Sequence, residues 1–418
     1  MMLIASFVVL LFFYALFSGR MERTVVTAPM VFTAGGVVLC EIFSDLLHQQ
    51  AEVREIIRAT FLRAAEVGLV MLLFTDASHT EFRVLKSIRA LPVRLLSLGM
   101  LLTILLGGLA ALAVFPQLTI WEAGIIAAIL APTDAGLGQI IVNSPRVPMR
   151  IRQALNVEAG LNDGLSVPFL LFFFALAARS AVGGESSLTQ FIVEQLGYGA
   201  LVGGGIGLVG GWLLGWARRR KMMTESLQQL GVVALPLLCL LMAEAVGASM
   251  FIAAFVAGLA VQAGFREAGK SSVEFTEEWG QLLNLAVFFL FGILVARDWA
   301  QFNWSHWLYA VTSLTVVRML PVAVALIGTR LSRATVLFMG WFGPRGLASI
   351  VLGLVYLEQE THLAGETTIR LTVMATVFLS IFAHGVTALP GINLYAKKIA
   401  MLSSDSPENE VADRKTAA

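Results

Sequence analysis

The chain of 418 residues is 57% hydrophobic and 14% charged, with a formal net charge of +1 and a mean hydropathy of +0.81. This composition excludes an ordinary soluble domain and predicts a polytopic membrane protein. The near-zero net charge, without a basic cluster interleaved with aromatic residues, argues against a nucleic-acid partner.

Apolar segments of about 20 residues, the length that spans a bilayer as a helix, recur along the whole chain. The first has no cleavage site of small residues and continues into further apolar segments, so we interpret it as a retained span. The segments lie at 3–18, 25–43, 61–77, 92–115, 120–143, 151–178, 189–217, 227–246, 248–264, 280–297, 304–329, 333–357 and 369–395. They predict an all-α polytopic membrane protein with about 13 transmembrane helices. The closely spaced glycines of the seventh segment, LVGGGIGLVGGWLLGW, favour tight helix packing.

The distribution of Lys and Arg predicts the orientation, because cytoplasmic loops are enriched in these residues. Alternate loops, ending with the C-terminal end of the last span, hold nineteen Lys and Arg residues, and the opposite loops hold six. This bias predicts a multi-pass protein of the plasma (inner) membrane, with its N-terminus outside and its C-terminus in the cytoplasm. The polar segment 402–418 is expected to be a disordered cytoplasmic tail.

Two spans contain residues that interrupt a helix. The fifth, AAILAPTDAGLGQIIV, places Pro132 and two glycines around Thr133 and Asp134. The twelfth, FMGWFGPRGLASIVLGL, places Arg345 between a Gly-Pro pair and a further glycine. A proline kink explains either break taken alone. With the seventh helix as a linker, however, each is the fifth span of a six-helix half, which indicates two inverted six-helix repeats with crossing interrupted helices. Asp134 and Arg345 then balance the partial charges at the half-helix ends.

The cytoplasmic half of the sixth span contains EAGLNDGLSVPF, which starts at Glu158 and combines polar and apolar residues. On a helix, Glu158, Asn162 and Ser166 share one face, and Asp163 lies about 100° around from Asn162. The polar side is therefore narrow and is expected to face the interior of the bundle.

The carboxylates of these spans are costly in a membrane. One ionised carboxylate costs about 2.5–3.5 kcal/mol at the bilayer centre, so Asp134, Glu158 and Asp163 together would cost on the order of 8–10 kcal/mol if unpaired. Arg345 offsets only one of these charges. The remaining negative charge requires protons or a bound cation, which indicates an exchanger.

Three motifs, APTDAGLGQ, VPMRIRQALNVEAGLNDGLSVP and FGPRGLASIVLGL, follow one another in this order. They resemble signatures of the cation:proton antiporter family that contains the prokaryotic and animal sodium/proton exchangers, and the similarity spans nearly the whole transmembrane region. The resemblance implies a secondary active transporter, not an enzyme, that exchanges sodium or lithium for protons. It also implies a homodimer embedded in membrane lipid, and no cofactor is expected.

By this resemblance, Asp163 binds the proton or the cation in turn. Asp134 and the backbone carbonyl of Thr133 complete the metal site for the monovalent cation. The neutral Asn162 leaves one exchangeable carboxylate at this pair, so exchange of one proton for one cation, an electroneutral cycle, is expected.

The resemblance also implies that Arg345 holds Glu158 and Asn162 in a supporting network. The family often has serine after the glutamate, where this chain has Ala159. Loss of that hydroxyl leaves the identity of the cation open, and water or the Ser166 hydroxyl is the expected substitute. The alternative within the same class is a potassium/proton antiporter.

The domain organisation implied by the resemblance divides the membrane region into four parts. Dimerisation-domain helices are expected at 1–77, and the first inverted unit of the core domain at 92–178. The linker helix and the remaining dimerisation-domain helices are expected at 189–297, and the second inverted unit of the core domain at 304–395.

Four further polar residues within the spans have weaker interpretations. Glu66 and Arg318 match positions of the family, although a structural role is favoured for both. Glu244 is interpreted as a solvated carboxylate near a helix end. For His384, a packing role is favoured over control of the pH response.

Two other classes of function are distinguishable from an exchanger. A channel or sensor on the same scaffold would keep the charged crossing but would not couple two fluxes. An intramembrane hydrolase is disfavoured, because the sequence has neither a His-Glu-x-x-His pattern nor a serine elbow.

Overall fold

The computed structural model describes residues 2–21, 24–42, 51–79, 90–182, 190–191, 193–265, 271–358, 363–402 and 406–408. Within these residues every regular element is a helix. Eight continuous helical stretches among them are long and apolar enough to cross a membrane, and three further apolar helices are shorter. The chain is therefore an all-helical, multi-pass membrane protein.

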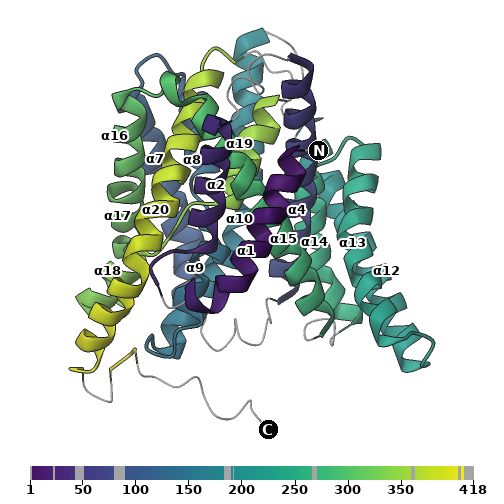
Figure 1. Ribbon diagram of the computed structural model, residues 1–418. Helices are drawn as coiled ribbons and strands as arrows, with labels where there is room; N and C mark the ends of the chain where they lie inside the picture. Colours follow the sequence, from purple (N-terminus) through teal and green to yellow (C-terminus); the bar gives the residue numbers. More distant parts are fainter. Residues whose placement is uncertain are drawn as a thin grey trace.

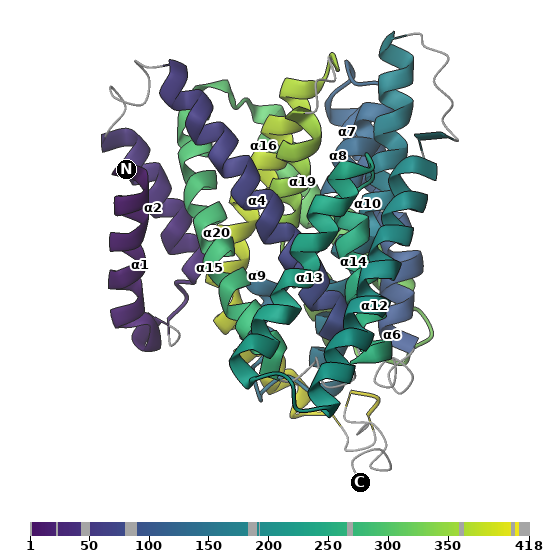
Figure 2. The same ribbon diagram turned by 90° about the vertical axis from the view of Figure 1, so that its right-hand side faces the viewer.

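Each predicted span coincides with a helix or with a helix that is interrupted. The elements are α1 (Met2–Met21), α2 (Ala28–Ile42), α4 (Ala51–His79), α6 (Ala90–Arg94), η1 (Leu95–Gly99), α7 (Met100–Val114), α8 (Ile120–Ile129), α9 (Ala135–Val142), α10 (Met149–Val182), η2 (Val193–Tyr198), α12 (Gly199–Arg219), α13 (Glu225–Ala245), α14 (Met250–Gly264), α15 (Ser271–Arg297), η3 (Trp299–Gln301), α16 (Trp304–Leu314), α17 (Val316–Ala325), α18 (Arg333–Trp341), α19 (Leu347–Glu358) and α20 (Glu366–Ile399). The N-terminal end of α1 and the C-terminal end of α20 lie toward opposite ends of the bundle (Figure 1, Figure 2).

Glycines bring α12 and α14 into direct backbone contact. Gly203, Gly207 and Gly211 are buried and recur every four residues, so they share one face of α12. A Cβ atom on Gly203 would overlap the backbone of Ala253 in α14. The tight packing predicted for the seventh span is confirmed.

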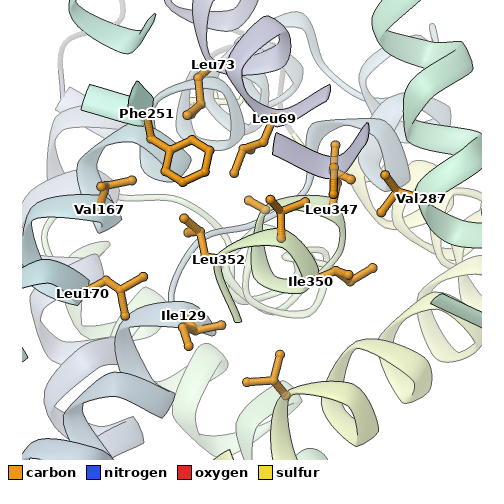
Figure 3. Close-up of a cluster of buried hydrophobic side chains, with 14 of the residues drawn as sticks. Leu69, Leu73, Ile129, Val167, Leu170, Phe251, Val287, Leu347, Ile350 and Leu352 are labelled. Atoms are coloured by element: carbon orange, nitrogen blue, oxygen red, sulfur yellow. The ribbon is translucent and has the colours of Figure 1, made fainter. Parts of the chain in front are cut away.

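The largest buried apolar cluster joins elements from both halves of the chain. It includes Leu69 and Leu73 of α4, Val167 and Leu170 of α10, Phe251 of α14, and Ile350 and Leu352 of α19 (Figure 3). Because lipid tails are as apolar as these side chains, the cluster stabilises the bundle through close packing. The cluster holds α10, which contains Glu158, Asn162 and Asp163. It also holds α19, which follows the break that contains Arg345.

The two predicted interruptions are present. Residues 130–134 separate α8 from α9, and residues 342–346 separate α18 from α19. The two pairs run in opposite directions, because α8 and α19 lie toward one end of the bundle and α9 and α18 toward the other (Figure 1).

Irregularities in other spans are not evident from the sequence, and two of them lie in spans expected to belong to the core domain. The fourth span contains the π-helical segment η1, and the eleventh is interrupted at Thr315, whose φ is −105° and ψ is −87°. The second irregularity starts the separate helix α17, which holds Arg318.

The expected disordered tail at 402–418 lies mostly outside the described residues. Its described part, residues 406–408, contacts the helical bundle at the N-terminal end of α18.

Candidate functional site

The two helix breaks meet at Asp134. Its backbone N–H donates a hydrogen bond to the carbonyl of Pro344 at 2.8 Å. Its carboxylate accepts from the N–H of Leu137 at 2.7 Å through Oδ1 and from the N–H of Leu347 at 2.6 Å through Oδ2. One carboxylate thus caps both half-helices that start at the crossing, α9 and α19, where the partial charge of a helix end is positive.

Gly346 provides the space for this carboxylate. A Cβ atom at position 346 would overlap the carboxylate group of Asp134. The glycine after Arg345 in the twelfth-span motif is therefore required by a side chain of the opposite break.

Arg345 lies at the C-terminal end of the half-helix α8. It is fully buried, and its Nη1 donates to the carbonyl oxygens of Ala131 and Pro132, the latter at 2.7 Å. Its backbone N–H donates to Ser380 Oγ at 2.7 Å. The two carbonyls follow the C-terminal end of α8, where the partial charge is negative. The predicted balance of half-helix ends by an acid and a base is confirmed.

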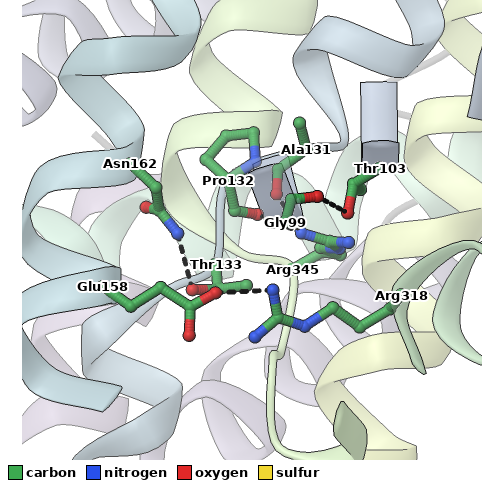
Figure 4. Close-up of polar contacts among 9 residues, drawn as sticks. All are labelled: Gly99, Thr103, Ala131, Pro132, Thr133, Glu158, Asn162, Arg318 and Arg345. Carbon is green, nitrogen blue, oxygen red and sulfur yellow. Dashed lines mark hydrogen bonds and ion pairs between the residues drawn. The ribbon is translucent and has the colours of Figure 1, made fainter. Parts of the chain in front are cut away.

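Glu158 pairs with Arg318 and not with Arg345. Arg318 Nη1 lies 2.6 Å from Glu158 Oε1, and only 5% and 4% of the two side chains are exposed (Figure 4). The expected contact between Arg345 and Glu158 is wrong, because the Arg345 guanidinium is directed at the carbonyls after α8. Arg318 is the cation of this network, and Gly343 leaves the space that its guanidinium occupies.

Asn162 is also held differently from the expectation. Its Nδ2 donates to Thr133 Oγ1 at 2.7 Å, so that α10 is tied to the first break rather than to Arg345 (Figure 4). Ser166 Oγ donates to the backbone carbonyl of Asp163 at 2.8 Å, which directs its hydroxyl hydrogen into its own helix.

Three buried oxygen atoms of the EAGLND stretch of α10 have no hydrogen-bond partner within the described residues. They are Glu158 Oε2, Asn162 Oδ1 and Asp163 Oδ1. Buried polar atoms are normally paired, so these oxygens indicate a place for water, a proton or a cation. Asp163 itself is 3% exposed.

One carboxylate near Asp163 is not identified by the sequence motifs. Asp76, close to the end of α4, packs against Gly160, about one helical turn before Asp163 on α10. Asp76 acts electrostatically on Asp163, as do Asp134 and Arg345. The polar run TDASH at the end of the third apolar segment is the signal that marks this position.

Three of the weaker candidates make contacts of a structural kind. Arg63 lies 3.1 Å from Glu66 and 3.4 Å from Glu244. His384 is buried, with Nε2 2.9 Å from the carbonyl of Trp341. Half of the Glu244 side chain is exposed, as is expected of a solvated carboxylate, whereas the contacts of Glu66 and His384 are of the structural kind favoured for them.

The fold and the site define a class of protein, the all-helical membrane proteins in which two interrupted helices cross with ionisable groups buried at the crossing. The chain belongs to the sodium/hydrogen exchanger family, since the family model described as "Sodium/hydrogen exchanger, transmembrane" matches residues 7–390. This is a family of transporters, so the chain is not an enzyme, and the resemblance inferred from the three motifs is confirmed.

The chain is 27% identical over 259 residues to a Na(+)/H(+) antiporter of Schizosaccharomyces pombe, covering 58% of this chain and 55% of that protein. It is 24% identical over 238 residues to the K(+)/H(+) antiporter NhaP2 of Shewanella oneidensis, covering 56% of this chain and 40% of that protein. The chain therefore spans about half, or less, of the length of these relatives. Its fold resembles that of the sodium proton antiporter MjNhaP1 from Methanocaldococcus jannaschii, with a TM-score of 0.74, 20% identity and coverage of 96% and 99% of the two chains.

Proposed function

We propose that the chain is a secondary active transporter that exchanges sodium or lithium for protons, with Asp163 as the shared binding group. The observation that supports this most directly is the Asp163 carboxylate, which is buried and has an oxygen without a hydrogen-bond partner within the described residues. Potassium is the second candidate cation, because one relative is named a K(+)/H(+) antiporter and because Ala159 lacks a hydroxyl ligand.

The charges around the helix crossing explain why a proton and a monovalent cation compete for Asp163. Glu158 is balanced by Arg318, and Asp134 is capped by two helix N-termini, whereas Asp163 makes no ion pair in the described part of the chain. An ionised Asp163 is therefore costly, and one proton or one monovalent cation removes the same single charge. The carboxylate of Asp134 and the backbone carbonyl of Thr133 supply further oxygen ligands, with water in the remaining positions.

The proposed transporter crosses the plasma (inner) membrane 13 times as two inverted six-helix repeats around a linker helix. The Lys and Arg bias supports an external N-terminus and a cytoplasmic C-terminus, and the opposite positions of the ends of α1 and α20 agree with it. The core domain comprises 92–178 and 304–395, and the homodimer forms through helices of 1–77 and 189–297.

The function is tested by cation-driven proton movement in proteoliposomes. Sodium, lithium, potassium and rubidium are added one at a time to acid-loaded vesicles that contain a pH dye. Dequenching by sodium and lithium supports the proposal, and dequenching only by potassium and rubidium selects the alternative. A cation flux that moves no protons would instead indicate a channel.

Exchange should be electroneutral, because Asp163 accepts either one proton or one monovalent cation. A membrane potential acts on an electrogenic cycle with about 2.3 kcal/mol per charge per 100 mV. Opposing sodium and pH gradients are set at the predicted balance point, and the potential is clamped with potassium and valinomycin once potassium has been shown not to be transported. The balance point should not move. If it follows the potential, a second carboxylate, Glu158 or Asp134, takes part in the cycle.

Ala159→Ser should lower the half-saturating sodium concentration, because it restores a hydroxyl oxygen beside the polar face of α10. Ala159 is 8% exposed. The matched control is Ala177→Ser, the same change at another buried position of α10, which should leave sodium affinity unchanged. Equal affinities for the parent and Ala159→Ser would mean that position 159 does not face the ion.

A further inference from the structure

A short segment beyond the family match docks on the bundle. The matching region ends at residue 390, and residues 406–408 lie against the N-terminal end of α18. Glu408 is 2% exposed, so its contacts are those of a buried residue.

The Glu408 carboxylate binds the start of α18. Its Oε1 accepts a hydrogen bond from the backbone N–H of Ser332 at 2.7 Å and another from Thr335 Oγ1 at 2.8 Å. Ser332 is the N-cap of α18, and its Oγ accepts from the N–H of Thr335 at 3.2 Å. Glu408 thus adds a carboxylate to a helix start that already has its N-cap hydroxyl.

The segment also contacts the helix of the first unit that holds the candidate site. The carbonyl of Pro407 accepts a hydrogen bond from Arg150 Nη1, at the start of α10, at 2.6 Å. On the other side, Thr335 Oγ1 lies 3.0 Å from the hydroxyl of Tyr395 in α20. Residues 407 and 408 therefore connect α10 with α18, and Thr335 in turn links α18 to α20.

The first interrupted helix has the same arrangement within its own sequence. α8 follows the N-cap Thr119, and Glu122, three residues later, accepts from the N–H of Thr119 at 2.8 Å. This is the capping box, in which a carboxylate at the third helical position binds the N-cap N–H. In α18 the third position is Thr335, which has no carboxylate, and Glu408 occupies the equivalent place on Ser332.

We propose that Glu408 is a positioning residue that completes the cap of the second interrupted helix from the tail and so fixes the helix break that follows. α18 has nine residues, so its capped end lies about 14 Å along the helix from the break that contains Arg345. Phe338 of α18 also stacks on Tyr395, with ring centroids 4.1 Å apart. Because α18 is short and packed against α20, a displacement of its first turn also displaces the break that contains Arg345.

The cap persists at physiological pH. Burial raises the pKa of the Glu408 carboxyl, but the hydrogen bonds from Ser332 and Thr335 outweigh it, so that this pKa lies below its ordinary value. With a depressed pKa, the stabilisation is complete above the ordinary carboxyl pKa and is lost as the pH falls through the folded-state value. The other charged or titratable groups at this contact are Arg150 and Tyr395.

The experiment measures amide hydrogen exchange in α18 and then the half-saturating sodium concentration of transport. The variants are Glu408→Ala, which removes the acceptor oxygens, and a chain that ends at Leu402, with Glu410→Ala as a control that removes a carboxylate from the same tail. In the two test variants, amides in the first turn of α18 should exchange with deuterium about fivefold faster, the size of one lost cap. Amides of α8, which has its own Glu122, should be unchanged. The half-saturating sodium concentration should rise in both test variants, and the control should behave as the parent.

A third variant tests whether the position of the carboxylate is what matters. Thr335→Glu in the chain that ends at Leu402 places a carboxylate at the third position of α18, and it should restore both amide protection and sodium affinity. Unchanged protection in Glu408→Ala and in the shortened chain overturns the proposal. Faster amide exchange with unchanged sodium affinity also overturns it, because Glu408 would then only stabilise the fold.

This inference rests on the proposed function for its transport readout. If the parent chain exchanges no cation, the proposed function fails, and the amide measurement alone decides whether Glu408 caps α18.

Discussion

Asp163→Asn is expected to insert into the membrane and fold, yet to lose cation/proton exchange completely. The amide has nearly the shape of the carboxyl group, but it can neither release a proton nor neutralise a bound cation. Because Asp163 makes no ion pair within the described residues, its neutralisation leaves no buried cation unpaired. Stability should therefore be retained, and thermal unfolding and dye dequenching by sodium are the two measurements.

The matched control for this variant is Glu244→Gln. Glu244 is also a carboxylate on a membrane helix, but half of its side chain is exposed and its partner is Arg63 at 3.4 Å. It should exchange at the parental rate. Full activity in Asp163→Asn would remove Asp163 from its proposed role, whatever the behaviour of the control.

Arg318→Ala is expected to produce the largest loss of stability. The substitution leaves the Glu158 carboxylate buried and without its 2.6 Å partner. Removing one partner of a buried ion pair commonly lowers the free energy of unfolding by about 3–5 kcal/mol, because the other charge remains buried and uncompensated. The yield of folded protein and the midpoint of thermal unfolding should both fall.

The double variant Arg318→Met with Glu158→Gln separates the missing partner from the missing pair. Replacing both charged groups by residues of similar size is often neutral or stabilising. The double variant should therefore recover most of the stability lost in Arg318→Ala. A parental melting temperature in Arg318→Ala would contradict the assignment of this pair and would mean that another cation, such as Arg345, can take its place.

The class of the protein and its helix breaks follow from local features of the sequence. Apolar runs of sufficient length define the spans, because a bilayer requires about 20 residues per helix. Pro132 and Pro344, each within a few residues of glycines, mark both interruptions, because proline removes a backbone donor and glycine weakens a helix. The acid and the base in these breaks were assigned to opposite half-helix ends from the helix dipole alone, and Asp134 and Arg345 occupy those ends.

The partners of the buried charges, by contrast, were decided only by the tertiary structure. Arg318 and Glu158 are 160 residues apart in the chain, and Ser332 and Glu408 are 76 apart. An arginine side chain is long enough to reach several carboxylates, so its partner depends on the backbone directions set by breaks such as that at Thr315. Residue spacing along one helix contains no information about those directions. For the same reason the sequence motifs do not reveal the approach of Asp76 to Gly160, about one helical turn from Asp163, because that approach depends on how α4 and α10 pack.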